Sequence, residues 1–424
     1  MLDRKLIIQN AQAVRDNCQR RGVDCDIEAL VALEERRLGV LQEVQDLNRR
    51  ANEVSKGIGA APDASAREQM IEQGRQLREQ KEATQREHDA LEEQINEIQA
   101  QIPNLTHPDV PIGGEQDARE LSLGKTAKPQ FDFTPLDHLQ LGEKHDLFDF
   151  EAGARVAGAG FYFLRNAAVR LDLALQQFAV SFLSERGFTP VMTPDLALTH
   201  VLYGTGFNPR GPETQIYSIA NTELNLVATA EIPLGGMMSG QTLQLEELPL
   251  RLCGLSHCFR TEAGAAGRAS RGLYRVHQFT KVEMFAYSAP EQSEALHEEM
   301  RTLECELFDQ LEVPYRVIDT ASGDLGGPAY RKYDLEAWMP GRGEAGEWGE
   351  VTSTSNCTDY QARRLNIRFK RGGQKGTEFV HTLNGTAVAT GRAMISILEN
   401  HQRADGSIAI PQVLRPWVGA DQIG

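Results

Sequence analysis

The segment 258–285, CFRTEAGAAGRASRGLYRVHQFTKVEMF, has the pattern that decides the fold of this chain. Its two ends alternate between polar and apolar side chains, whereas residues 263–272 between them are nearly all Gly, Ala, Ser or Arg. Alternation with a period of two predicts strands, and small polar residues predict a loop. We therefore expect two antiparallel strands joined by a long loop.

Side chains of one parity in these strands should form a polar face. They are Cys258, Arg260 and Glu262 on the first strand, and His277, Phe279, Lys281 and Glu283 on the second. Val276, Val282 and Met284 have the opposite parity and should rest on helices. A solvated outer face is one interpretation of these charges. The other is a nucleotide site, because arginine binds phosphate, carboxylate accepts from an amine and a ring stacks on a base.

The residues Phe259-Arg260-Thr261-Glu262, the loop, and Arg275-Val276-His277-Gln278-Phe279 resemble motif 2 of class II aminoacyl-tRNA synthetases. In particular they resemble the bacterial-type seryl-tRNA synthetases, and the resemblance covers nearly the whole chain. It implies an α+β fold. A class II catalytic domain, with an antiparallel sheet flanked by helices, would follow an antiparallel two-helix coiled-coil arm.

The composition limits the classes of function. The chain has 424 residues and a net charge of −16, from 44 basic and 60 acidic residues. Phosphate affinity depends on Lys and Arg, so this balance argues against a general nucleic-acid binder, and any RNA contact must be local. The six cysteines include no CxxC pair, which favours free thiols in a reducing compartment. Without a membrane-length apolar run or a signal-like start, we expect a soluble cytoplasmic protein with no membrane partner.

Two heptad seams predict a helical hairpin over about 27–102. The first seam comprises Leu30, Leu33, Arg37, Val40, Val44, Leu47, Ala51 and Val54. The second comprises Met70, Gly74, Leu77, Lys81, Thr84, His88, Leu91, Ile95, Ile98 and Ile102. Residues 56–62, rich in Gly and ending in Pro, should form the tip. At ~1.5 Å per residue the arm would be about 45 to 60 Å long.

The sequence leaves the role of this arm open between dimerisation, support of a neighbouring domain and RNA binding. The tip region 49–78 is net basic in an otherwise acidic chain, which favours a local RNA contact. Its basic residues are Arg49, Arg50, Lys56, Arg67, Arg75 and Arg78. The family resemblance implies that the arm reaches the long variable arm of a tRNA.

We expect an N-terminal tRNA-binding domain over 1–105, a Pro-rich linker over 106–135 and a catalytic domain over 136–424. Residues 166–185 predict an amphipathic helix. The following segment 186–194 resembles motif 1, the class II dimer element, and so implies a homodimer. Near the C-terminus, 377–383 predicts a strand, 384–386 a turn, and Arg392 lies at the start of a helix that resembles motif 3.

The resemblance implies ATP and Mg²⁺ as cofactors and assigns three groups of site residues. The catalytic residues would be Arg260 and Arg392. ATP would contact Arg260, Thr261, Glu262, Arg275, Val276, Phe279, Glu350, Val351, Thr352, Ser353 and Arg392, with Glu350 and Ser353 as the magnesium ligands. Serine would contact Thr229, Ala230, Glu231, Arg260, Glu283, Asn384 and Thr386.

Individual roles follow from the same resemblance. Arg260 would contact the α-phosphate and the serine carboxylate, while Arg275 and Arg392 would hold the outer phosphates. Glu262 would bind the adenine amine and Phe279 would stack on the base. Glu283 would pair with the ammonium or the hydroxyl of serine. No side chain in the sequence is an evident general base for transfer to tRNA.

The implied activity is ATP-dependent ligation of serine to the 3′ end of tRNA(Ser), through a seryl-adenylate, in protein biosynthesis. Whether tRNA(Sec) is also a substrate stays open. A synthetase-like ligase that loads an amino acid onto a carrier protein is the alternative, although it has no need of a tRNA-length arm. A non-catalytic coiled-coil scaffold is the third reading, and it should have lost Arg260, Glu350 or Arg392, which are all present.

Overall fold

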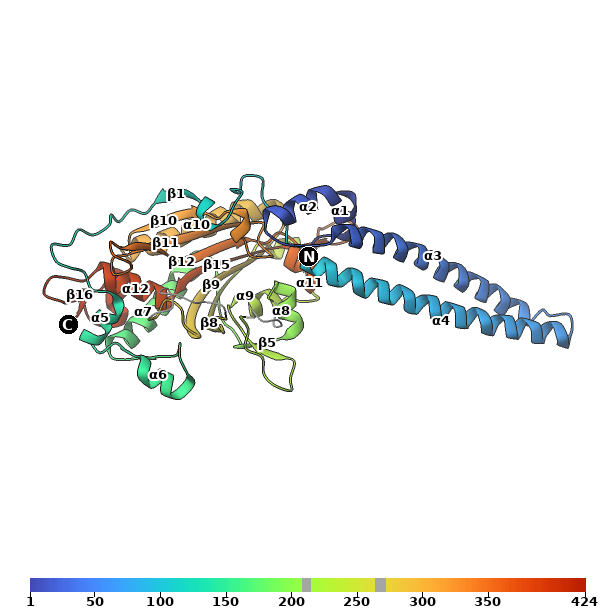
Figure 1. The fold of residues 1–424 in the computed structure, drawn as a ribbon, viewed down its shortest axis with the longest axis horizontal. Coiled ribbons are helices and arrows are strands. Elements are labelled where there is room, and N and C mark those ends of the chain that lie inside the picture. Colours follow the sequence, from blue (N-terminus) through green and yellow to red (C-terminus); the bar gives the residue numbers. More distant parts are fainter. Residues whose placement is uncertain (208–214, 264–271) are drawn as a thin grey trace. The chain divides into compact units, whose positions relative to one another are not determined.

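The computed structural model describes residues 1–207, 215–263 and 272–424 (Figure 1). Most of the predicted loop, 264–271, therefore lies outside the described residues. The chain divides into two compact units, Met1–Leu105 and Thr106–Gly424. The segment 106–135, interpreted above as a linker, contributes a strand to the main sheet of the second unit.

The first unit contains a long antiparallel helical hairpin, as the heptads predicted (Figure 1). Its helices are α1 Arg4–Gln9, α2 Ala11–Arg20, α3 Ile27–Ile58 and α4 Ala64–Gln101. Asp26 and Asp63 begin the two long helices, because each carboxylate accepts a hydrogen bond from a first-turn amide. The seam buries Leu30, Val40, Val44, Leu47, Leu77, Leu91 and Ile95.

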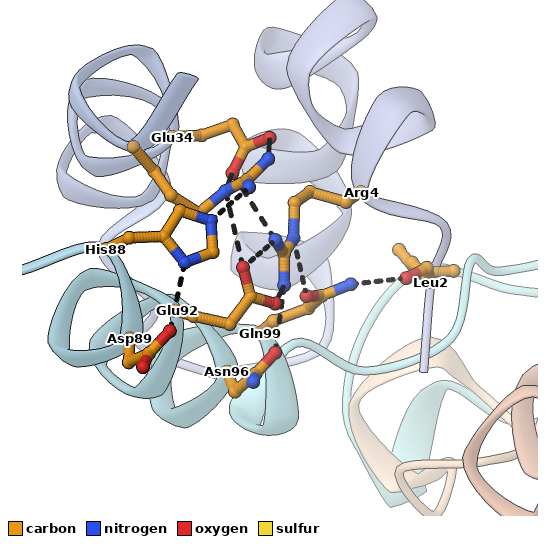
Figure 2. Close-up of polar contacts among 9 residues, drawn as sticks. Leu2, Arg4, Glu34, His88, Asp89, Glu92, Asn96 and Gln99 are labelled. Atoms are coloured by element: carbon orange, nitrogen blue, oxygen red, sulfur yellow. Dashed lines mark hydrogen bonds and ion pairs between the residues drawn. The ribbon is translucent and has the colours of Figure 1, made fainter. Parts of the chain in front are cut away.

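A polar cluster interrupts this apolar seam (Figure 2). Glu34 is buried, with only 6% of its surface exposed, whereas the predicted seam residue Leu33 is half-buried. Arg37 forms two hydrogen bonds of 2.7 Å to Glu34 and one of 3.0 Å to His88 on α4. Arg4 pairs with Glu92 at 2.8 Å, which fastens α1 to the hairpin. The heptad pattern did not predict that Glu34 is buried in the seam, because apolar periodicity does not show which polar pairs are buried.

The second unit is built on an eight-stranded sheet with the order β1-β10-β11-β12-β15-β9-β8-β4. All neighbours are antiparallel except β4 and β8, which confirms the predicted antiparallel sheet. The strands are β1 Arg119–Leu123, β4 Thr189–Met192, β8 Leu250–Phe259, β9 Gln278–Ser288, β10 Tyr315–Asp319, β11 Arg331–Met339, β12 Glu347–Asn356 and β15 His381–Ala389.

Three helices cover one face of this sheet: α7 Ala167–Ser184, α10 Ser293–Gln310 and α12 Thr390–Asn400. The core between them and the sheet includes Val282 and Met284, whose apolar parity predicted this contact. Leu335, Leu383 and Ala387 also point into it. Because side chains alternate along a strand, their neighbours Asp334, Asn384 and Thr386 lie on the opposite face.

Short elements complete the second unit. The helices are α5 His138–Lys144, α6 Phe150–Ala157, α8 Thr199–Thr205, α9 Glu231–Gly236, α11 Tyr360–Leu365 and α13 Arg415–Val418. The short strands are β2 Phe148–Asp149, β3 Phe163–Leu164, β5 Leu196–Leu198, β6 Leu224–Leu226, β7 Thr242–Gln244, β13 Arg368–Lys370, β14 Glu378–Phe379, β16 Ile408–Ala409 and β17 Gln422–Ile423.

The predicted hairpin is the pair β8 and β9, with Cys258 opposite Phe279. Strand β8 ends at Phe259, and Glu262 has a φ of 51°. The predicted parity therefore does not extend to Glu262, because a residue in the left-handed region leaves the pleat.

The turn predicted at 384–386 is wrong, because β15 runs unbroken through these residues. Thr386 lies opposite Glu283 on β9, and a register irregularity follows between Thr386 and Val388. Asn and Gly favour turns in isolation, but here they pair on both sides inside a central strand.

None of the helices in the described ranges is long and apolar enough to cross a membrane.

Candidate active site

A cavity opens where β8, β9, β12 and the start of α12 meet. It is lined by Arg260, Glu262, Leu273, Tyr274, Arg275, Val276, Phe279, Lys281, Glu350, Val351, Thr352, Thr386, Ala389, Gly391 and Arg392. Segments separated by more than a hundred residues thus supply one concave surface. Two predicted ATP residues, Thr261 and Ser353, do not line the cavity itself.

Arg260 directly follows β8, and its position is set from two sides. Its Nε donates a 3.3 Å hydrogen bond to the Ala228 carbonyl oxygen. Its guanidinium carbon lies 5.2 Å from the centroid of the Phe279 ring. One bond through Nε leaves the terminal nitrogens of a guanidinium available for an anion.

Arg392 in the first turn of α12 lies deep in the cavity. Its Nη1 donates to the Glu350 carbonyl at 3.0 Å and to Glu350 Oε1 at 3.1 Å, and its guanidinium carbon lies 4.5 Å from the Tyr274 ring centroid. Burial by itself raises the pKa of Glu350, but the charges of Arg392, Lys332 and Arg260 outweigh it and lower the pKa. Glu350 is therefore an anion in this site.

Arg275 and Glu262 face each other across the end of the hairpin. Arg275 Nη1 donates to Glu262 Oε2 at 3.3 Å, and the Arg275 side chain is 42% exposed. The pair places one cation and one carboxylate at the cavity wall. A weak exposed pair of this kind is easily exchanged for a ligand.

A second group of predicted residues places two carboxylates close together, with Glu283 buried and Glu231 partly buried. Glu231 Oε1 accepts from Asn384 Nδ2 at 3.0 Å, and Glu283 Oε2 accepts from the Thr386 hydroxyl at 3.2 Å. Burial, reinforced by the Glu283 charge, raises the pKa of Glu231 to about 7. The Thr229 hydroxyl accepts from the Glu231 backbone amide, which begins α9. The structure therefore brings most of the residues that were predicted to contact serine close together, with two acids next to one another.

The predicted magnesium ligands can be tested on their donor chemistry. Glu350 supplies a carboxylate and Ser353 a hydroxyl, which are hard oxygen ligands of the kind magnesium takes. No group of three or more His, Cys, Asp or Glu side chains able to hold a metal occurs among the described residues. The carboxylate and the hydroxyl suit an ion that completes its shell with substrate phosphates and water.

Sequence reasoning left four residues of this region unassigned. Lys281 pairs with Glu283 at 2.5 Å, Gln361 Nε2 donates to Glu231 Oε1 at 2.7 Å, Tyr274 donates to the Glu350 carbonyl at 3.1 Å, and Lys332 pairs with Asp334 at 3.2 Å. The parity of the hairpin could have identified Lys281. No local pattern identifies Gln361, which lies on α11, far from Glu231 in sequence.

Family models match both parts of the chain. The "tRNA synthetase class II core domain (G, H, P, S and T)" matches residues 216–401, and the "Seryl-tRNA synthetase N-terminal domain" matches residues 1–106. The serine–tRNA ligase of Rhodopirellula baltica is 74% identical over 421 residues, covering 99% of each chain. The chain belongs to the seryl-tRNA synthetase family. This confirms the expected family and excludes the scaffold reading.

Other members of the seryl-tRNA synthetase family agree over the full length. The serine–tRNA ligase of Rubrobacter xylanophilus is 53% identical over 100% of this chain and 99% of its own. The crystal structure of seryl-tRNA synthetase from Pyrococcus horikoshii complexed with ATP superposes with a TM-score of 0.92 at 38% identity, covering 100% of this chain and 99% of that one. The carrier-protein ligase alternative has no support among these relatives.

Proposed function

We propose that this chain joins serine to the 3′ end of tRNA(Ser) at the expense of ATP, through a seryl-adenylate. Membership of the seryl-tRNA synthetase family makes it an ATP-dependent serine–tRNA ligase by descent. The observation that carries the residue assignment is the convergence of Arg260, Arg392 and Glu350 on one cavity, with the acids Glu231 and Glu283 close by.

In the first step a serine carboxylate oxygen attacks the α-phosphorus of ATP, and the bond to the bridging oxygen breaks to release pyrophosphate. Arg260 binds the serine carboxylate and the α-phosphate, and so stabilises the charge of the transition state. Arg275 and Arg392 bind the outer phosphates. Phe279 stacks on adenine and Glu262 accepts a hydrogen bond from its amine. Because these contacts hold the base, the α-phosphate is aligned for in-line attack by the serine carboxylate.

The serine side chain and ammonium group lie among polar groups. Glu231 pairs with the ammonium, and Glu283, Thr229, Asn384 and Thr386 complete the pocket around the hydroxyl. Because these buried groups need partners, alanine would leave them unpaired and is rejected, while threonine is excluded by size. Ala230 and Thr261 contribute backbone around the ligand.

Mg²⁺ would be held by Glu350 and Ser353, with Val351 and Thr352 as the adjoining wall. When bound, the ion neutralises the charge on the phosphates of ATP. Glu350 also orients Arg392 through its carbonyl and Oε1. Glu350 would therefore position both the Mg²⁺ ion and the Arg392 guanidinium around the phosphates.

In the second step the 3′-terminal ribose hydroxyl of tRNA attacks the seryl carbonyl and AMP leaves. The arm formed by α3 and α4 holds the long variable arm of tRNA(Ser). The same contact extends to tRNA(Sec) if that tRNA presents an arm of similar length, and charging assays with both transcripts decide this. We place the reaction in the cytoplasm and in a homodimer.

Serine-dependent exchange of labelled pyrophosphate into ATP, run with each standard amino acid, tests this proposal. We expect exchange with serine well above that with alanine or threonine, and transfer of serine to tRNA(Ser). Exchange that is strongest with another amino acid, or charging of a carrier protein instead of tRNA, would contradict it.

A further inference from the structure

Asp334 on β11 is a buried acid beside the two proposed magnesium ligands, and neither the sequence nor the family resemblance assigned it a role. Only 8% of its surface is exposed. It lies directly opposite Ser353 in the antiparallel pair of β11 and β12. Side chains of directly opposed residues lie about 4.5 to 5.5 Å apart at Cβ and interact.

The face on which Asp334 lies is the substrate face of the sheet. Its neighbours Tyr333 and Leu335 point the other way, since Tyr333 donates to Glu298 on α10 and Leu335 lies in the core. Alternation therefore places Asp334 and Ser353 on the same side as the serine-site residue Thr386.

The carboxylate of Asp334 is held from one side and open on the other. Oδ2 accepts from the Thr320 hydroxyl at 3.2 Å and pairs with Lys332 Nζ at 3.2 Å. Oδ1 is buried and has no hydrogen bond of standard geometry within the described residues, and the Ser353 hydroxyl lies close enough to the carboxylate to interact with it. A buried carboxylate oxygen of this kind calls for a donor.

A hydroxyl that binds a metal through its oxygen must send its hydrogen elsewhere. The Asp334 carboxylate faces Ser353 across the strand pair and is a hydrogen-bond acceptor for its hydroxyl. We infer that Asp334 is a positioning residue for the magnesium site: it accepts the Ser353 hydroxyl hydrogen and so turns the serine oxygen toward the metal. Lys332 and Thr320 fix the carboxylate in the orientation that this requires.

This inference rests on the proposed function, because Glu350 and Ser353 are proposed ligands. Partners that orient a ligand typically change metal affinity by about 10- to 100-fold when they are removed. We therefore expect Asp334→Asn to raise, by about that factor, the Mg²⁺ concentration at which ATP binds with half-maximal affinity. ATP binding without serine, followed by calorimetry over a Mg²⁺ series, measures this without catalysis.

Two controls separate positioning from stability. AMP lacks the outer phosphates, so its affinity without Mg²⁺ should be the same in Asp334→Asn and wild type. Asp319 is a comparable acid on the neighbouring strand β10, fully buried and paired with Arg119 and Arg331. Asp319→Asn should lower the unfolding midpoint and leave the Mg²⁺ dependence of ATP binding unchanged.

A double-mutant cycle tests whether Asp334 affects the magnesium site through Ser353. If Asp334 acts through Ser353, the double variant Asp334→Asn/Ser353→Ala should need no more Mg²⁺ than Ser353→Ala alone. Effects that add, or a wild-type Mg²⁺ dependence in Asp334→Asn, overturn the inference. If Asp334→Asn does not fold, Asp334→Glu retains the charge but displaces the oxygens, and the same criteria apply. Wild-type ATP binding that ignores Mg²⁺ would instead contradict the proposed metal site.

Discussion

At the scale of single residues, Arg260 is the side chain on which the proposed chemistry depends most. Its Nε bond to Ala228 and its contact with the Phe279 ring orient the guanidinium toward the cavity. Arg260→Ala removes a cation that contacts both reactants in the transition state. We expect serine-dependent pyrophosphate exchange to fall by ~10²-fold or more.

Arg301 provides the matched control for that variant. It also contacts an aromatic ring, Tyr333 at 5.5 Å, and pairs with Glu298, but on α10 behind the sheet. Arg301→Ala should keep near wild-type exchange. A folded Arg260→Ala protein with the activity of the Arg301 variant would disprove the assignment.

The pKa of Glu231 leads to a prediction about pH. Burial and the Glu283 charge raise this pKa to about 7 in the ligand-free protein, so below that pH the carboxyl is protonated. Binding of the serine ammonium favours the ionised carboxylate. The KM for serine should therefore rise roughly tenfold per unit as pH falls below 7, and level off above it.

Steady-state exchange rates measured against serine concentration between pH 5.5 and 8.5 check this. Glu231→Gln cannot ionise, so its KM should be high and nearly independent of pH in that range. A wild-type KM that stays flat through pH 7 would show that Glu231 does not pair with the ammonium.

At the scale of elements, the arm of α3 and α4 is the part whose function the sequence left open. Several of its tip cations are already engaged: Arg49 pairs with Asp46 at 3.1 Å, and Arg75 pairs with Glu72 and Glu79. In the described part of the chain, Arg50, Lys56, Arg67 and Arg78 have no ion pair with a carboxylate. Arg78 is instead held by a hydrogen bond from its Nε to the Gly74 carbonyl oxygen, which leaves Arg50, Lys56 and Arg67. These three are therefore the best candidates to contact RNA phosphate.

We predict that changing Arg50, Lys56 and Arg67 to Glu weakens tRNA(Ser) binding and raises the KM for tRNA, with the largest effect at low salt, because the variant has lost phosphate contacts and its affinity falls less steeply as salt rises. Serine-dependent exchange should stay unchanged, because all the cavity residues lie in the second unit. Arg75→Gln at the same tip is the matched control and should have little effect. Charging assays over a salt series measure the difference.

Replacing residues 30–100 by a short flexible linker is the stronger test of the arm. Exchange should survive, whereas transfer to tRNA should collapse, because an acidic protein has little other means of holding RNA. Equal charging of tRNA by the armless and full-length proteins would make the arm structural.

At the scale of the whole molecule, the edge of the main sheet bears on assembly. Strand β4, in the segment that resembles motif 1, is the last strand of the sheet. Met192 on it is 81% exposed, and Leu196 and Leu198 nearby are 38% and 45% exposed. Apolar side chains gathered beside an unpaired edge are typical of a surface that another chain covers.

We therefore predict that the protein sediments as a dimer and that Met192→Asp shifts it toward the monomer. Val156→Asp is the matched control, since Val156 is 76% exposed on the separate helix α6. Sedimentation velocity over a range of protein concentrations distinguishes the two variants. An unchanged dimer in Met192→Asp would move the interface away from β4.

Periodicity predicted those parts of the fold whose signals are local. The heptads predicted the helical hairpin because each turn of α3 and α4 repeats the same apolar contact. The alternation around 258–285 predicted β8 and β9 for the same reason. The turn predicted at 384–386 failed because local propensity favours it, while pairing with β9 and β12 keeps these residues extended.

By itself the sequence determined the helical arm, the central hairpin and the family, since each is encoded in contiguous or regularly spaced residues. Only the tertiary structure decided which distant side chains meet. Gln361 reaches Glu231, Lys332 holds Asp334 opposite Ser353, and Glu34 lies buried among arginines. The physical reason is that strand register and helix packing bring together residues with no fixed spacing along the chain, and burial then sets their charge and their partners.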